Sequence, residues 1–184
     1  DSAIEDYIQP VRYHSYKSCI VDVPWGKFYK KRIIDEHHIR FPEDIDFKED
    51  EIFNYRYLKY VETLEISDFV GYNYRLLPNS LARREFSNEL LYNLVQHWVE
   101  EAEGFGDNLK TDILQRACEY LMRLIYKVPS LKQKQDIAHQ VLSINANNPL
   151  RLQHIAHVAS KFGVSVGSVL LVGLSVVGNM KRAI

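Results

Sequence analysis

The chain has 184 residues, of which 46% are hydrophobic and 12% aromatic, and this composition is typical of a globular protein rather than a disordered one. The formal net charge of −1 disfavours nucleic acid as a partner and gives no sign of a long polybasic arm for anionic lipid. The two cysteines, Cys19 and Cys118, lack the paired spacing of a zinc site or a small disulfide scaffold, so we expect reduced thiols and a cytoplasmic protein.

Strand-like and helical segments alternate in the first part of the chain. The short β-branched run 18–23 predicts a strand, and residues 61–66 and 69–74 predict two more. Between them we expect one helix over residues 25–36 and another that begins near Asp50, where apolar residues recur at spacings of three and four. This alternation predicts a mixed α/β region.

The second part of the chain has an almost wholly helical pattern. Ser87 can cap a helix that ends before Gly104, and Asp107 can cap the next one. A weaker pattern predicts a helix over 131–143, and Asn148, which a proline follows, opens a further one. We therefore expect a small helical bundle or a helical cap.

Residues 164–178 are apolar but too short to span a bilayer, which takes about 20 residues. A buried terminal element is the favoured interpretation. The alternative is a peripheral membrane contact through residues 164–184, which Lys181 and Arg182 could assist.

The densest polar region, residues 37–51, holds two histidines and six carboxylates. Asp44 and Asp46 spell the Asp-x-Asp with which nucleotide-sugar enzymes hold manganese or magnesium. That pair normally ends a buried strand, whereas here it follows Pro42 and Glu43 in what the pattern predicts to be a loop. We therefore favour an exposed acidic turn over a metal site.

The histidines also give a weak case for metal binding. His37 and His38 are adjacent and point in different directions on a helix or a strand, so they do not easily share one ion. His154 and His157 lie three apart, but no glutamate accompanies them at zincin spacing. We predict no metal ligand in this chain, and a metal-dependent hydrolase built on these acids and histidines stays an alternative.

Three consecutive acids, Glu49, Asp50 and Glu51, stand directly before the predicted aromatic helix. Carboxylates there can cap exposed N–H groups and are stabilised by the helix dipole. Alternatively, one of them projects into a cleft and takes a proton from a hydroxyl nucleophile. Composition and spacing leave both explanations open.

The segment PWGKFYKKRIIDEHHIRFPEDIDFKEDEIFNYRYL, residues 24–58, resembles the second half of bacterial family 2 glycosyltransferases. In that family a Trp-x-Lys-x-Tyr helix leads to an Arg-Phe-Pro-Glu turn and then to Glu-Asp-x-x-Phe. The later YNYRLLPNS, residues 72–80, is similar to the family's Tyr-x-Tyr-Arg segment with a downstream serine. The motifs together span residues 23–80 in the family's order and spacing.

The resemblance implies inverting transfer of a sugar from a nucleotide diphosphate sugar to an acceptor hydroxyl, on a glycosyltransferase A-type fold. Asp50 would be the general base, and Glu49 would hold position or contact the acceptor. Trp25 could offer a sugar-stacking face and Lys27 a hydrogen bond or charge to the acceptor. Arg75 would contact the donor diphosphate.

The resemblance also implies that part of the enzyme lies upstream of Asp1. The family's N-terminal half supplies the nucleotide-binding strands and the metal-binding Asp-x-Asp, and residues 1–22 resemble neither. We expect the complete enzyme to use manganese or magnesium, with ligands mostly in that missing half, and the chain alone to be inactive. Residues 1–80 would form the acceptor-side part of a truncated α/β catalytic domain and 81–184 a mainly α-helical extension.

The expected partners are a nucleotide-sugar donor and a glycan acceptor, in bacterial surface polysaccharide synthesis, with no nucleic acid. We expect a cytoplasmic location, either free or peripheral on the inner face of the membrane. Open sheet edges would favour a homo-oligomer. The competing hypothesis is a non-catalytic helical module for interaction or membrane docking, based on the amphipathic stripes of the last hundred or so residues.

Overall fold

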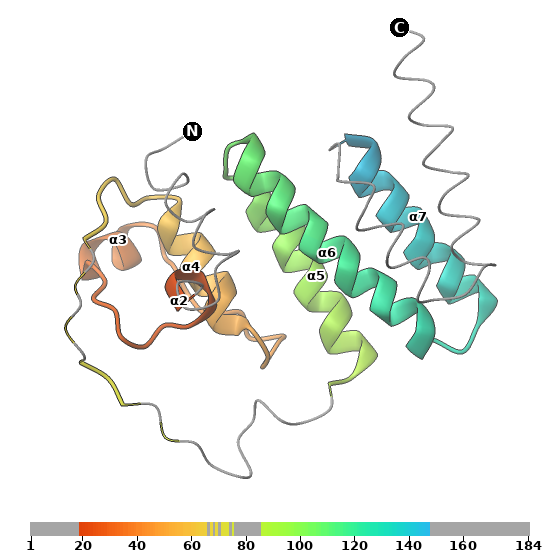
Figure 1. Cartoon of the computed structure of the whole chain (residues 1–184), viewed down its shortest axis with the longest axis horizontal. Helices are drawn as coiled ribbons and strands as arrows, with labels where there is room; N and C mark the ends of the chain where they lie inside the picture. Colours follow the sequence, from red (N-terminus) through yellow and green to blue (C-terminus); the bar gives the residue numbers. More distant parts are fainter. Residues whose placement is uncertain are drawn as a thin grey trace, which may run out of the picture. The chain divides into compact units, whose positions relative to one another are not determined.

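The computed structural model describes residues 19–65, 67, 69, 71–73, 75 and 86–147 (Figure 1). The helices within these ranges are α2 (Cys19–Asp22), α3 (Lys31–Glu36), α4 (Glu49–Leu58), α5 (Asn88–Ala102), α6 (Asp107–Lys127) and α7 (Leu131–Asn147). The chain divides into two compact units, Asp1–Lys110 and Thr111–Ile184, so the first turn of α6 belongs to the first unit. The predicted domain boundary at residue 80 lies outside the described residues.

The mixed α/β prediction is wrong, because the described residues are mostly helical and contain no strand. The run 18–23, predicted as a strand, contains the helix α2 instead. Short β-branched runs fit either state by pattern, and here contacts with α4 accompany the helical form. Residues 61–65 are irregular, and a strand there would need a partner for its backbone N–H and C=O groups. A glycosyltransferase A-type α/β segment therefore does not describe this part of the chain.

The helix predicted over residues 25–36 is shorter than expected. A turn at Trp25 and Gly26 precedes an extended stretch, and only Lys31–Glu36 is helical. Gly26 has a φ of 69°, a left-handed conformation that glycine adopts without a steric cost. This turn separates Trp25 and Lys27 from the helix that was expected to carry them.

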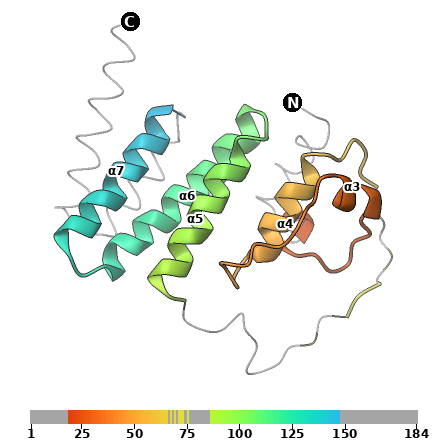
Figure 2. The same ribbon diagram turned by 180° about the vertical axis from the view of Figure 1, so that it is seen from behind.

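The core of the first unit lies around α4, which packs against α2 and α5 (Figures 1 and 2). Tyr55 and Ile52 of α4 are fully buried. On the side toward α3, Phe53 and Tyr57 of α4 form a buried cluster with Ile39. The aromatic helix predicted to begin near Asp50 is thus confirmed, and it is the element on which the first unit is built.

The helices after residue 86 follow the predicted pattern. The Ser87 hydroxyl accepts a hydrogen bond from the Leu90 N–H at 3.1 Å, so the predicted cap of α5 is confirmed. Asp107 is the first residue of α6 rather than its cap. The predicted apolar stripes are buried on α5, at Leu91, Leu94, Val95, Trp98 and Ala102, and on α6, at Ile113, Leu114, Ala117, Leu121, Leu124, Ile125 and Val128.

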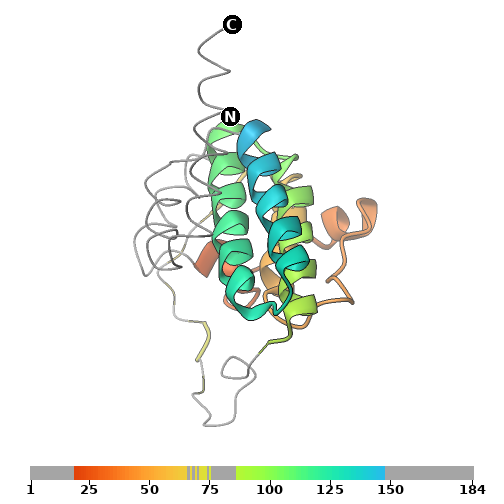
Figure 3. The same cartoon turned by 90° about the vertical axis from the view of Figure 1, so that its right-hand side faces the viewer.

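In the second unit, α6 and α7 run side by side in opposite directions (Figure 3). The helix predicted over 131–143 is confirmed, and it extends to Asn147. Every helix in the described ranges is too short or too polar to cross a lipid bilayer. The helix predicted after Asn148 and the apolar segment 164–178 lie outside those ranges.

Candidate functional site

Asp50 is the second residue of α4 and is partly exposed. Its Oδ1 accepts a hydrogen bond from the Glu51 N–H at 2.8 Å. Partial burial raises the pKa of Asp50 from 3.8 to about 6; the Glu51 N–H opposes this rise, and the negative charge of Glu49 adds to it. The carboxyl group therefore changes its charge state close to neutral pH.

Lys48 precedes α4 in a left-handed conformation, with a φ of 60°. Its Nζ lies 2.9 Å from Oε2 of Glu51, whose side chain is fully buried. The Lys48 ammonium also acts to lower the pKa of Asp50. The buried Glu51 thus holds a cation beside the candidate base.

Asn54, one turn after Asp50, ties α4 to the segment that contains Trp25 and Lys27. Its Nδ2 donates to the backbone carbonyl of Val21 at 2.7 Å and to that of Val23 at 3.1 Å. Its Oδ1 accepts a hydrogen bond from the Tyr29 hydroxyl at 2.7 Å. A buried amide with three such bonds fixes the two segments relative to each other.

Tyr29 lies close to the candidate base. Burial raises its pKa, and the neighbouring Tyr57 and Asp50 raise it further, so the phenol stays protonated and remains a donor. The Tyr57 hydroxyl in turn accepts a hydrogen bond from the Lys30 N–H at 2.7 Å. The two tyrosines pack edge to face, with ring centroids 4.9 Å apart.

Trp25 and Lys27 are both partly buried and lie on the segment that Asn54 holds. The Trp25 indole stacks on Tyr72, with ring centroids 4.8 Å apart and planes 14° from parallel. One face of the indole is therefore covered, and only the other could stack on a sugar. The Lys27 Nζ donates a hydrogen bond to the Val23 carbonyl, which anchors the turn between them.

Arg75 and Glu49 have a weaker structural connection to the site. Arg75 is exposed, and both of its sequence neighbours, residues 74 and 76, lie outside the described ranges. Glu49 is the first residue of α4 and is partly exposed beside Asp50. The structure thus brings Asp50 and Glu49 together and ties them to the Trp25 and Lys27 segment, whereas it establishes no link between Asp50 and Arg75.

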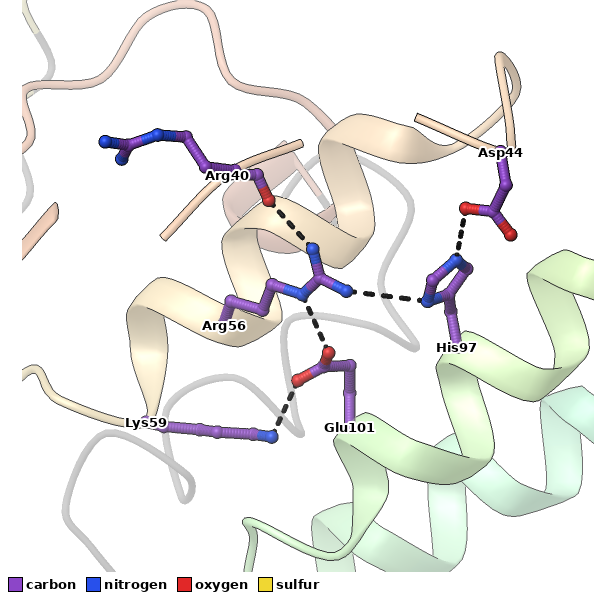
Figure 4. Close-up of polar contacts among 6 residues, drawn as sticks. All are labelled: Arg40, Asp44, Arg56, Lys59, His97 and Glu101. Atoms are coloured by element: carbon purple, nitrogen blue, oxygen red, sulfur yellow. Dashed lines mark hydrogen bonds and ion pairs between the residues drawn. The ribbon is translucent and has the colours of Figure 1, made fainter. Parts of the chain in front are cut away.

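Sequence reasoning missed a polar cluster that joins α4 to α5 (Figure 4). Glu101, only 5% exposed, accepts from Arg56 Nε at 2.8 Å and from Lys59 Nζ at 2.6 Å. Arg56 also donates to the Arg40 carbonyl at 2.9 Å. Arg56 lies in the last turn of α4, and Lys59 caps the end of that helix three residues later. This spacing puts both side chains on one helical face and could have signalled the pair.

The same cluster contains His97, whose two ring nitrogens have different partners. An Arg56 N–H lies 3.5 Å from Nδ1, and Nε2 lies 2.8 Å from Oδ1 of Asp44. Nε2 thus faces the Asp44 carboxylate, and Nδ1 faces the Arg56 guanidinium. The hydrogen bond to His97 is the main cause of a lowered pKa at Asp44.

The candidate metal residues are dispersed. Asp44 and Asp46 are exposed on the loop before α4. His37 ends α3 and stacks on Tyr60, with ring centroids 3.6 Å apart. Among the described residues, no three histidine, cysteine or carboxylate side chains are grouped so that they could hold an ion. His154 and His157 fall outside that part of the chain.

Asp50 thus stands in the first turn of α4, with a pKa raised to about 6, on the helix to which Asn54 ties the Trp25 and Lys27 segment. This geometry suits a group that accepts a proton from a bound hydroxyl. Comparison of the chain with protein-family models, with curated proteins and with solved structures finds no match.

Proposed function

We propose that this chain supplies the acceptor side of an inverting glycosyltransferase and that Asp50 is its general base. Asp50 would take the proton of the acceptor hydroxyl as that oxygen attacks the anomeric carbon of a nucleotide diphosphate sugar. The bond from the anomeric carbon to the diphosphate breaks in the same step, and the diphosphate leaves with the electron pair. The sugar is transferred with inversion.

The position of Asp50 carries the proposal, because this partly buried carboxyl group stands in the first turn of α4, the helix that Asn54 ties to the segment with Trp25 and Lys27. Its raised pKa supports the same role. A carboxylate whose only role is to cap a helix is stabilised in its ionised form, and its pKa falls. At Asp50 the effect of burial exceeds that of the hydrogen bond from Glu51, and the pKa rises to about 6. A base is most effective when its pKa lies near the working pH, which favours a catalytic role over a purely structural one.

The mechanism does not depend on a sheet in this part of the chain, because a helix carries the base. Asn54 bonds to the Val21 and Val23 carbonyls, just before the turn with Trp25 and Lys27, and we propose that the acceptor sugar binds between that turn and Asp50. In this proposal the face of the Trp25 indole opposite Tyr72 stacks on the sugar, and Glu49 orients it.

The donor side completes the proposal. Arg75 would contact the diphosphate, and a manganese or magnesium ion held mostly by an upstream segment would neutralise the leaving group. The acceptor would be a growing bacterial surface glycan.

The test is Asp50→Asn in the complete enzyme. The asparagine keeps the hydrogen bond from the Glu51 N–H but takes no proton, so turnover should fall by about a hundredfold to ten-thousandfold while donor binding is unchanged. Asp46→Asn, the same change at an exposed loop residue, should leave turnover intact. Near-normal turnover by Asp50→Asn would remove Asp50 from the base role.

A further inference from the structure

Phe28 is an apolar side chain held in solvent beside a group of cations. Its relative exposure of 105% is the highest among the large hydrophobic residues in the described part of the chain. Lys30, Lys31 and Arg32 follow it and are all exposed. Contact of an apolar ring with water is unfavourable in free energy, so a fully exposed phenylalanine indicates a surface that can bind an apolar partner.

The backbone at Phe28 is fixed by its neighbours. Tyr29 points inward, where it packs edge to face on Phe53 with ring centroids 5.5 Å apart and bonds to Asn54. The Lys30 N–H is held by the Tyr57 hydroxyl. Because the two residues that follow Phe28 are anchored, ordered backbone presents its ring outward.

Two exposed acids of α3, Asp35 and Glu36, lie one turn beyond Lys31 and Arg32 and offset part of the positive charge, which leaves an excess of one cation among these residues and Lys30. The first turn of α3 contains no acid. Lys31 pairs with Asp35, but both side chains are more than half exposed, so solvent screens the pair and it adds little. The overall net charge of −1 had concealed this local concentration of positive charge.

We propose that Phe28, Lys30, Lys31 and Arg32, the basic aromatic surface, dock the protein on an anionic lipid bilayer. The Phe28 ring would enter the headgroup region, and the three cations would contact the anionic headgroups around it. A bilayer interface offers an apolar layer directly beneath fixed negative charge, which matches both features of the surface. The proposal concerns residues other than 164–184 and does not depend on the transferase activity.

Two other partners fit less well. Single-stranded nucleic acid binds to grooves in which cations accompany aromatic rings that stack on successive bases, and this surface presents one ring. An acidic protein would satisfy the three cations but gives no reason for a fully exposed Phe28. Binding to single-stranded nucleic acid is therefore measured as an outcome of the test.

The experiment is flotation of the full chain with vesicles of phosphatidylcholine, with and without phosphatidylglycerol. We expect binding to the anionic vesicles only, weakened by salt. Phe28→Ala should lower the partition coefficient about tenfold. The double variant Lys30→Glu/Arg32→Glu should lower it by at least about twentyfold. The side chains of Phe28, Lys30 and Arg32 have no described partner within the protein. Circular dichroism checks that each variant is folded.

Two controls match these changes. Leu64→Ala removes an exposed apolar side chain that lies between Glu62 and Glu65 and should not affect binding. Lys127→Glu/Lys132→Glu changes the net charge by the same amount at exposed positions outside the surface and should reduce binding far less.

Several results would overturn the proposal. These are absence of binding by the unaltered chain, equal binding to neutral vesicles, unchanged binding of Phe28→Ala, and an equal loss in the two charge variants. Unchanged binding of Phe28→Ala is also the result expected if residues 164–184 alone held the chain on the vesicles. Fluorescence anisotropy with a single-stranded oligonucleotide completes the test, because tight binding lost in the same variants would assign the surface to nucleic acid instead.

Discussion

The ionisation of Asp50 depends on a balance of neighbours. Burial and the charge of Glu49 favour the protonated carboxyl group, while the Glu51 N–H and the Lys48 ammonium favour the carboxylate. Because Lys48 is held by its ion pair with the buried Glu51, its charge stays close to the site. The charge state of Asp50 is therefore set by the first turn of α4 itself.

This balance predicts the effect of removing Lys48. A titration followed by the carboxyl ¹³C resonance should give Asp50 a pKa of about 6. Lys48→Met should raise that pKa, because the cation that stabilises the carboxylate is gone. Lys110→Met removes one positive charge at a residue that pairs with Glu103 and should leave the pKa of Asp50 unchanged. An Asp50 pKa near 4, or one that falls in Lys48→Met, would refute this account.

The raised pKa of Asp50 also predicts how the free energy of unfolding depends on pH. The pKa of Asp50 is higher in the folded chain than in the unfolded chain, so the folded state binds the proton more tightly. Proton binding therefore adds to the free energy of unfolding of the unaltered protein, and this gain is complete below about pH 4. The gain is lost as the pH rises through about 6. Asp50→Asn does not titrate and should be the more stable protein at about pH 8, by about 1 kcal/mol after allowance for solvent screening of a partly exposed group.

Thermal unfolding of both proteins across this pH range checks the prediction. The difference in melting temperature should be smallest in acid and should grow in favour of Asp50→Asn toward alkaline pH. A constant difference would mean that Asp50 titrates alike in the folded and unfolded chains.

At the scale of elements, Glu101 is the main polar link between α4 and α5. It lies at 5% exposure between Arg56 and Lys59, so its removal leaves two cations without their buried partner. Glu101→Ala should lower the free energy of unfolding by about 2 kcal/mol, measured by urea denaturation. Glu100→Ala, at the neighbouring exposed position, should cost well under 1 kcal/mol. Equal losses in the two variants would show that the ion pairs add nothing beyond helix propensity.

Gly104 lies beside the Lys59 side chain that pairs with Glu101. A Cβ at this position would collide with the end of the Lys59 side chain, which runs over the glycine toward Glu101. Gly104→Ala should therefore displace Lys59 and reduce the effect of a second change, Lys59→Met, on unfolding. A double-mutant cycle measures this coupling, and strict additivity would refute it.

The helices were predictable where local chemistry and long-range packing agree. Ser87 at the start of α5 and the apolar stripes of α5 and α6 indicated their elements directly, because capping and periodicity are local properties. Residues 18–23 were not predictable in this way. A four-residue helix has no period to detect, and its surroundings include two carbonyl bonds from Asn54, 31 and 33 residues away.

In the candidate site, too, local patterns were readable from the sequence and long-range contacts were not. Their place before an aromatic helix singled out Glu49 and Asp50, but it left a capping and a catalytic role open, and only the family resemblance favoured the catalytic one. The raised pKa of Asp50 and the roles of Asn54 and Tyr29 depend on burial and on contacts across the chain, which no local pattern encodes. The turn at Gly26 was missed because one glycine within a helical pattern is weak evidence of a break.

At the scale of the whole molecule, the proposed activity requires a donor site that the described residues do not contain. They hold no group of metal ligands, and Arg75 alone cannot retain a nucleotide diphosphate. In the proposed function, the rest of the donor site therefore comes from residues outside the described ranges.

If the donor site lies mostly elsewhere, the 184-residue chain should not bind nucleotide sugars tightly. Titration calorimetry with uridine and guanosine diphosphate sugars and manganese should show dissociation constants above about 1 mM, the weak range expected for isolated phosphate contacts. In the proposed mechanism Asp50 contacts the acceptor and not the donor, so Asp50→Asn should not weaken any donor binding that is seen. Micromolar, manganese-dependent binding by the chain alone would contradict the proposal that the donor site lies elsewhere. Asp50 would then work beside a nucleotide site within this chain.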